Sequence, residues 1–515
     1  MKRILGSSVL SVILASTVGA CSSHFYALTC QSDADCGPGL VCVPDGSYCK
    51  NASQVPITVG ISAPLTGPVQ DLGVRVLAGI NLAFSEQNAQ GGVRGRQLTT
   101  QDMDDESQPM LTMSNIGALV DKQDDPADPP NCPTTQMPPG GASPVASHRL
   151  ARGPRAALAI MGTVGAPTTL QGVPLAIETQ TLVFAPQSGS QPLLRDGSAG
   201  PCSRFVFTVR SGFAWEAEAL VAYFDTLGIK DSQHIFSFDQ NNELGSEGFE
   251  DLQAALAGDA HFKGSIQPPQ QIGGRFRYDF GSGYAQVDAA VGQLEAALTN
   301  LLKNDPSPSV PVGVFVMATY GPGAELVRDL RDWQNQALSQ NPDLSRLRLN
   351  FGAESPIVLD SFVSTLKEMS NGGTYTDVTS GAPVTKAYWQ DFVATQTVPN
   401  YQTDSGDFVT QYKAAANKFG VTPTATSLEG YLGGRLFVAG LLQQQGPLDA
   451  ATLIPTFESM GNLWTSLGVH AGFGPTSHQY LKSVWGVKLD SNGSFNDVFY
   501  WEFNLNGPNQ FKIYG

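Results

Sequence analysis

The segment from Ile57 to Asp105 constrains the fold of this chain more than any other part of the sequence. A short apolar run is followed by a turn that contains Pro and Gly. After the turn, apolar residues recur at the spacing of one helix face: Leu72, Val76, Ile80, Ala83 and Phe84. Gly91 can end that helix in the left-handed conformation, and an acidic run closes a second strand. The order strand, turn, helix, strand is the parallel α/β unit, whose ligands bind at the carboxyl ends of the strands. Thr66, in the turn, is therefore expected at the edge of a cleft.

Strand-like and helix-like patterns alternate along most of the remaining sequence. The expected strands cover residues 57–62, 157–161, 181–185, 205–209, 234–238, 312–317, 347–351 and 484–489. The expected helices cover residues 215–227, 248–256, 287–302, 324–338, 407–419 and 428–443. Most of these strands are short and apolar on both faces, as buried parallel strands are. The alternation predicts an α/β fold with parallel sheets, interrupted by loop-rich stretches at 124–154 and 372–407.

Length and charge limit the possible classes of protein. A chain of 515 residues with 41% hydrophobic content is too long for one core, so two or more packed domains are expected. The formal net charge of −16 would repel a phosphate backbone, which argues against a nucleic-acid partner.

The amino terminus has the pattern of a secretory signal. Lys2 and Arg3 precede an apolar run and then small residues, so residues 1–20 are predicted to be a signal peptide. The last of these residues and Cys21 resemble the bacterial lipobox, in which the cysteine is lipidated and becomes the new amino terminus. Because no later segment has eighteen consecutive apolar residues, attachment to the membrane is expected through this lipid alone. A bacterial envelope lipoprotein facing the periplasm is predicted, on either the outer or the inner membrane.

Six further cysteines remain for pairing in an oxidising compartment. Cys30, Cys36, Cys42 and Cys49 lie in a short segment (21–54) that is too small for a hydrophobic core, so two disulfides are predicted to hold it together. A zinc site is the alternative, but it fits the spacing less well because no two cysteines form a close pair. The connectivity of the four stays open. In the body of the chain Cys132 and Cys202 are the candidates for a third disulfide.

Several motifs in the expected order resemble the type I periplasmic solute-binding proteins of the branched-chain amino-acid (Leu/Ile/Val) family, which serve ABC importers. The strongest match covers residues 57–68, 78–80, 88–96 and 104–109, and weaker ones follow at 160–162, 184–190, 238–245, 319–322, 351–354 and 472–475. The resemblance implies two Rossmann-like lobes that close on a small ligand about three crossovers, near Arg210, Asp377 and Val484. Lobe 1 would comprise 55–209 and 378–484, and lobe 2 would comprise 210–377 and 485–515.

The resemblance also implies a ligand site. In amino-acid-binding members, hydroxyls and backbone N–H groups at a helix start hold the ligand carboxylate, and an acid from the other lobe binds the ammonium. Carried onto this chain, the helix start falls on 165–169, a second loop on 187–190 and the acid on Glu354. The expected ligand-binding residues are Thr66, Thr168, Thr169, Ser188, Gly189, Ser190, Leu244, Tyr320 and Glu354. Structural roles are the alternative, since the threonines could cap the helix and Tyr320 could pack locally.

No catalytic motif is found in the sequence. A nucleophile elbow, a zinc-protease helix and a phosphate loop are all missing, and no two histidines stand four residues apart. We therefore expect no enzyme activity, no cofactor and no metal. The expected function is capture of an amino acid or a similar small polar solute by a monomeric, lipid-anchored receptor, which presents it to an ABC permease in the inner membrane. The alternative is an envelope lipoprotein of the same fold that acts as a regulator, a scaffold or a ligand sensor without transport.

Overall fold

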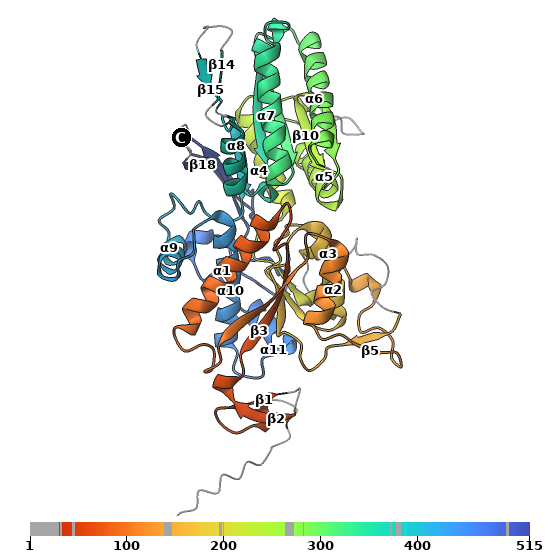
Figure 1. Cartoon of the computed structure of the whole chain (residues 1–515), viewed down its shortest axis with the longest axis vertical. Helices are drawn as coiled ribbons and strands as arrows, with labels where there is room; N and C mark the ends of the chain where they lie inside the picture. Colours follow the sequence, from red (N-terminus) through yellow and green to blue (C-terminus); the bar gives the residue numbers. More distant parts are fainter. Residues whose placement is uncertain are drawn as a thin grey trace, which may run out of the picture.

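The computed structural model describes residues 30, 33–43, 47–138, 147–194, 198, 200–262, 272–281, 283–370, 373–376, 383–386, 388–490 and 494–514. The predicted signal peptide and Cys21 lie outside these residues. Figure 1 shows two α/β lobes stacked along the long axis of the molecule, with a small hairpin at the free end of lobe 1.

Lobe 1 is built on a five-stranded parallel sheet in the order β4-β3-β7-β8-β9. Its strands are β3 (Ile57–Ala63), β4 (Leu98–Asp104), β7 (Ala159–Met161), β8 (Leu182–Phe184) and β9 (Val206–Phe207). Its helices are α1 (Gln70–Asn88), α2 (Pro109–Leu119), α3 (Ala166–Glu178), α9 (Asp407–Phe419), α10 (Ala425–Gln443) and α11 (Ala450–Glu458). The predicted strand, turn, helix and strand at the start of this lobe are thus confirmed as β3, α1 and β4.

The closest helix packing in lobe 1 is between α1 and α10. A Cβ atom on Gly79 of α1 would lie 2.1 Å from the backbone oxygen of Ser427, and one on Gly430 of α10 would lie 2.3 Å from that of Val76. Only glycine therefore permits this approach at either position. The contact holds α10, from the later part of the chain, against α1, the helix of the first strand-helix-strand unit.

Lobe 2 contains an eight-stranded sheet in the order β11-β10-β12-β13-β16-β17-β18-β19, which is parallel as far as β16 and antiparallel beyond it. Its strands are β10 (Ile235–Gln240), β11 (Gly274–Tyr278), β12 (Val310–Met317), β13 (Leu347–Ala353), β16 (Phe392–Gln396), β17 (Ser483–Leu489), β18 (Phe495–Glu502) and β19 (Gln510–Ile513). Its helices are α4 (Phe213–Thr226), α5 (Glu243–Gly258), α6 (Tyr284–Asn304), α7 (Tyr320–Ala337) and α8 (Leu359–Ser370). The α/β fold class is confirmed, and the antiparallel edge is an addition that the sequence patterns did not predict.

The described residues pass between the lobes at three places. The first passage follows β9 and the third precedes β17; the two are hydrogen-bonded to each other, since Thr208 N donates to His478 O at 2.8 Å and Tyr480 N to Thr208 O at 2.9 Å. The middle passage follows β16, which belongs to the sheet of lobe 2. The second crossover therefore lies later than the position expected near Asp377, a residue outside the described part of the chain.

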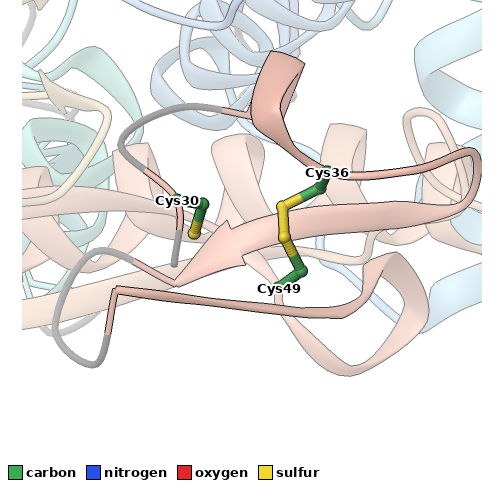
Figure 2. Close-up of side chains that lie close together, drawn as sticks. All are labelled: Cys30, Cys36 and Cys49. Atoms are coloured by element: carbon green, nitrogen blue, oxygen red, sulfur yellow. A yellow bond between two sulfur atoms is a disulfide. The ribbon is translucent and has the colours of Figure 1, made fainter. Parts of the chain in front are cut away.

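The four clustered cysteines form two disulfides, Cys30–Cys42 and Cys36–Cys49, around the hairpin of β1 (Leu40–Val43) and β2 (Tyr48–Asn51). Figure 2 shows the Cys36–Cys49 bond beside Cys30. Because all four sulfurs are bonded in pairs, the zinc alternative does not hold and the connectivity is first to third and second to fourth.

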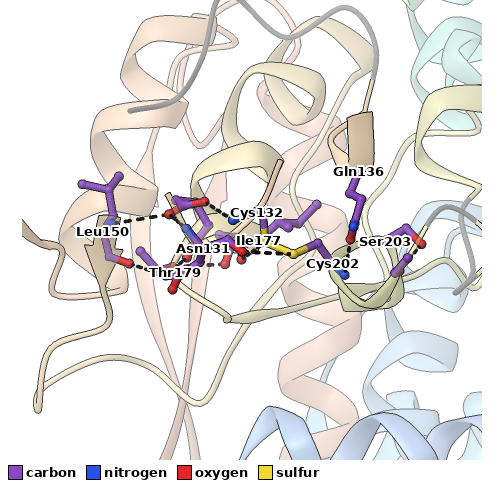
Figure 3. The surroundings of a disulfide bond; sticks show 11 residues. Asn131, Cys132, Gln136, Leu150, Ile177, Thr179, Cys202 and Ser203 are labelled. Atoms are coloured by element: carbon purple, nitrogen blue, oxygen red, sulfur yellow. Dashed lines mark hydrogen bonds between the residues drawn. A yellow bond between two sulfur atoms is a disulfide. The ribbon is translucent and has the colours of Figure 1, made fainter. Parts of the chain in front are cut away.

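A third disulfide joins Cys132 to Cys202 with their Cα atoms 5.9 Å apart, and it attaches the loop-rich stretch to η6 (Pro201–Phe205) (Figure 3). Glu178, at the end of α3, holds the same stretch. It is 1% exposed and accepts N–H groups from Asn131 at 2.6 Å and Cys132 at 3.0 Å. The stretch contains two short strands, β5 (Gln123–Asp125) and β6 (Arg149–Ala151).

Among the described residues, no helix combines the length and the apolar composition that crossing a membrane requires.

The Cys132–Cys202 disulfide should contribute strongly to stability because it closes a loop of 70 residues. In the chain-entropy description, a loop of this size corresponds to about 4 kcal/mol, and native disulfides typically contribute about 2–5 kcal/mol. Replacing both cysteines with serine should lower the free energy of unfolding by about 2–4 kcal/mol in a urea titration. A variant that matches the wild type, or free thiols at these positions in the folded protein, would contradict this expectation.

Candidate functional site: a cavity between the lobes

A cavity of about 230 Å³ lies between the two lobes. It is smaller than the roughly 300–1,000 Å³ pockets that hold drug-sized ligands, which indicates a small solute. Its apolar wall combines residues of both lobes: Val69, Leu72 and Val164 from lobe 1, and Phe213, Leu244 and Leu359 from lobe 2. A solute in this cavity would contact both lobes at once.

The amino-terminal ends of several helices meet at the cavity, because parallel strands present their carboxyl ends, and the helices that follow, at one edge of each sheet. Ala166, Pro167 and Thr168 at the start of α3 line it, as does Leu244 near the start of α5. Gly165, which precedes α3, offers no side-chain cap, so the first N–H groups of α3 are not satisfied by a capping side chain. Such a helix end favours an anionic group of a ligand.

Arg210, in the first passage between the lobes, brings charge into the cavity wall. Its Nη2 lies 3.2 Å from Glu216 Oε1 and also donates to Ser355 Oγ, while its Nε lies 3.7 Å from Glu429 Oε1. Glu429 of α10 lines the cavity, and its other oxygen accepts from Thr397 Oγ1 at 2.8 Å. Burial raises the pKa of the Glu429 carboxyl, and Arg210 opposes that rise.

Gln396 at the end of β16 also lines the cavity. It is 4% exposed, and neither its Oε1 nor its Nε2 has a hydrogen-bond partner among the described residues. A buried polar group without a partner costs about 1–3 kcal/mol, so an amide in this state is expected where a ligand supplies the missing partners.

The backbone is strained at Val358, another residue of the cavity wall. It has a φ of +50° in the left-handed region, which is unfavourable for a β-branched residue. It joins η9 (Ser355–Ile357) to α8. Strain of this kind is typical of ligand-binding and active sites.

Among the residues expected to bind a ligand, Thr168 and Leu244 lie in the cavity wall. The Thr168 hydroxyl donates back to Gly165 O at 3.0 Å. Thr169 is buried behind it, with its hydroxyl 3.2 Å from Thr163 Oγ1. Thr66 holds its own turn, since its Oγ1 donates to Asp104 Oδ2 at 2.5 Å.

The loop of Ser188, Gly189 and Ser190 is buried beside the cavity but does not line it. Ser190 Oγ donates to Glu247 Oε2 of α5 at 2.5 Å, which joins lobe 1 to lobe 2. Gly189 O accepts from Phe213 N at 3.0 Å. The loop is thus placed at the contact between the lobes.

Glu354 lies one residue before Ser355, which lines the cavity, but its own carboxyl group does not. It is fully buried, and neither oxygen has a hydrogen-bond partner in the described part of the chain. Burial, and then the nearby carboxyl groups of Glu216, Asp251 and Glu247, hold the pKa of Glu354 well above its usual range, against the opposing charge of Arg210. Tyr320, at the start of α7, is half-buried and is likewise absent from the cavity wall.

Arg210, Gln396 and Glu429 are among the polar residues of the wall that sequence reasoning missed. Arg210 was expected only as a crossover, Gln396 fell in a stretch expected to be loop, and Glu429 was hidden inside a helical pattern. The position of Arg210 at the hinge is the one signal that could have marked it, because an arginine there must be buried and paired.

The described residues also contain two clusters of potential metal ligands, and both lie outside the cavity wall. Cys30, Cys36 and Cys49 are bonded in disulfides and offer no thiolate. The other cluster consists of Asp288, Glu325 and Asp329 on α6 and α7.

Comparison with known proteins agrees with this architecture. A family model described as periplasmic binding protein matches residues 56–127. The Leu/Ile/Val-binding protein homolog 3 of Brucella melitensis is 34% identical over 70 residues, which are 14% of this chain and 19% of that protein. The chain thus spans about a fifth of the length of the curated relatives it matches.

Solved structures extend the likeness to most of the chain. A possible leucine/isoleucine/valine-binding protein from Rhodopirellula baltica has a TM-score of 0.62 at 23% identity, covering 87% of this chain and 98% of its own. A branched chain amino acid ABC transporter from Thermus thermophilus with bound valine has a TM-score of 0.59 at 15% identity, covering 86% and 95%. The chain has the fold of the type I periplasmic binding proteins. Its resemblance to the Leu/Ile/Val-binding family is confirmed, and the sequence match lies in the first β-α-β unit.

The unpartnered amide of Gln396 predicts opposite effects on stability and on binding. Gln396→Leu removes two buried polar atoms without partners, so the ligand-free protein should be unchanged or more stable by about 1 kcal/mol in urea unfolding. Affinity for a solute that contacts the amide should fall at least tenfold, which corresponds to about 1.4 kcal/mol. Gln334→Leu is the matched control, because Gln334 Nε2 donates to two backbone oxygens at 3.2 and 3.0 Å, and this change should destabilise the protein. Clear destabilisation by Gln396→Leu would contradict the interpretation.

Glu354 predicts a pH dependence of stability. The unfolded carboxyl ionises near its ordinary pKa of 4.5, whereas the folded one stays protonated to higher pH, so raising the pH favours the unfolded state. The stability from protonated Glu354 is complete below the unfolded pKa and is lost as the pH rises through the folded pKa. Glu354→Gln, which cannot ionise, should therefore gain stability over the wild type as the pH rises from 4 to 8.

Urea midpoints across this range measure the gap between the two proteins. Glu250→Gln, on the exposed side of α5, is the matched control and should show no growing gap. Parallel curves for Glu354→Gln and the wild type would mean that Glu354 is charged in the folded state.

Proposed function

We propose that this protein is an extracytoplasmic solute-binding protein that captures a small zwitterionic solute, such as an amino acid, between its lobes. The observation that carries the proposal is the interlobe cavity itself: a space of about 230 Å³ whose wall is mostly apolar and includes buried polar groups. Binding and closure would be its function, with no bond made or broken in the solute.

The two ends of the site would differ in charge. The uncapped start of α3 suits a carboxylate, and Thr168 lies beside it. Elsewhere in the wall, the carboxyl groups of Glu216 and Glu429 share the guanidinium of Arg210. An excess of acidic groups favours an ammonium, and Glu429 is the acid that lines the cavity. We therefore assign the ammonium to Glu429 in place of Glu354, and the polar middle of the solute to Gln396.

The partners follow from the proposed function. An ABC permease in the inner membrane would receive the solute, and lipid on Cys21 would hold the protein at the envelope. Support for this comes from the lipobox-like sequence and from the names of the similar structures, which include a branched chain amino acid ABC transporter with bound valine.

The experiment that tests the proposal is a thermal-shift and calorimetric screen of amino acids and short amides. A solute at about 100 times its dissociation constant should stabilise the folded state by roughly 2.7 kcal/mol. For the best solute, the analogue without the carboxylate and the analogue without the ammonium should each bind at least tenfold more weakly. Glu429→Gln should remove most of the discrimination that depends on the ammonium. Glu250→Gln should retain it, because Glu250 is exposed on α5 and does not line the cavity.

If no solute in the panel raises the thermal midpoint of the wild type, the proposal is wrong, and a regulator or scaffold of the same fold is favoured. Binding that is indifferent to both charged groups would keep a solute-binding function but exclude a zwitterion.

A further inference from the structure

Helices α6 and α7 run side by side on lobe 2 (Figure 1), on the opposite side of its sheet from α4 and α5. They present carboxyl groups to each other. Asp288 of α6 and Glu325 and Asp329 of α7 each place one oxygen within 4.8 Å of the others. Glu325 and Asp329 are four residues apart, so they share one face of α7.

One cation of the chain already lies in this cluster. Arg328 Nη2 lies 2.9 Å from Glu325 Oε1, and its Nε lies 2.6 Å from Asp329 Oδ1. The guanidinium thus occupies one oxygen of Glu325 and one of Asp329. Three carboxylates around one guanidinium leave two negative charges, which is the charge that a divalent cation would balance.

Glu325 provides a second, independent observation. Its side chain is 3% exposed, and its Oε2 has no hydrogen-bond partner among the described residues. A buried carboxylate oxygen without a donor, on a residue beside other carboxylates, is costly unless something positive binds it.

The cluster also opens to solvent. A polar hollow adjoins it, and Asp329 belongs to both. Glu295 of α6 and Asp332 and Trp333 of α7 line the rest of the hollow. An ion could enter by this route, and water could complete its coordination shell.

We propose that Asp288, Glu325 and Asp329 form a binding site for a hard divalent cation, with Ca²⁺ as the preferred ion. The donors are all carboxylate oxygens, which suit Ca²⁺, Mg²⁺ and Mn²⁺ rather than Zn²⁺. Ca²⁺ accepts irregular shells of six to eight oxygens, whereas Mg²⁺ demands a near-octahedral shell. The bound ion would fasten α6 to α7, away from the solute cavity. Sequence reasoning could not find the site because its residues come from two helices joined by a long connection.

The test uses the full-length protein, purified in detergent and stripped with a chelator. Tb³⁺ is the first probe, because Trp333 lies one turn from Asp329 and can sensitise its luminescence. We expect the protein to sensitise Tb³⁺ emission, and we expect Ca²⁺ to abolish this emission at a lower concentration than Mg²⁺ does. Ca²⁺ should also raise the thermal midpoint of unfolding. Asp288→Asn and Glu325→Gln should each weaken Ca²⁺ binding at least about tenfold.

Glu368→Gln is the matched control. Glu368 is exposed on α8 and belongs neither to the cluster nor to the hollow, so Ca²⁺ affinity should not change. Because Asp288 is exposed, its variant should fold even if that of Glu325 does not, and circular dichroism checks both. No binding of Tb³⁺ or Ca²⁺ by the wild type, or Ca²⁺ affinity that neither cluster variant reduces, would overturn the site.

Discussion

The Arg210 guanidinium is the interaction on which the arrangement of the two lobes depends. From the first passage it contacts Glu216 of α4, Ser355 of η9 and Glu429 of α10. Its own backbone oxygen accepts from Gln479 of the third passage at 3.2 Å. The middle passage joins through the two acids, since Thr395 donates to Glu216 and Thr397 to Glu429. One buried charge thus connects all three passages, and a buried charge requires that its partners stay in place.

The cavity beside Arg210 keeps groups that do not favour the folded state. In the wall, the amide of Gln396 is buried without partners and Val358 has a strained backbone. Next to the wall, Glu354 is buried with both oxygens unbonded in the described part of the chain. By contrast, the buried carboxylate of Glu178 accepts from N–H donors. The contrast is physical evidence that this cavity is adapted to bind rather than to stabilise.

The sequence predicted much of the fold but little of the site. Periodicity located α1 and α9 because a helix face repeats along a continuous segment, and parallel strands such as β12 are apolar on both faces. By contrast, β16 is five residues long and lies between loop-like stretches, so neither the strand nor Gln396 at its end was visible. Family motifs brought the prediction to Glu354, one residue from the cavity wall. Glu354 follows β13 and precedes η9, and only the structure settles which way its side chain points.

The hydrogen bonds between the first and third passages determine how the lobes can move. Thr208 and Val209 pair with His478, Tyr480 and Leu481, so these two segments form a short parallel ribbon, while the middle passage runs separately. A hydrogen-bonded ribbon bends more easily out of its plane than it shears within it. The lobes are therefore joined by two connections, the paired ribbon and the middle passage, instead of by three independent segments. This arrangement favours opening and closing of the lobes about one axis and resists twisting of one lobe past the other.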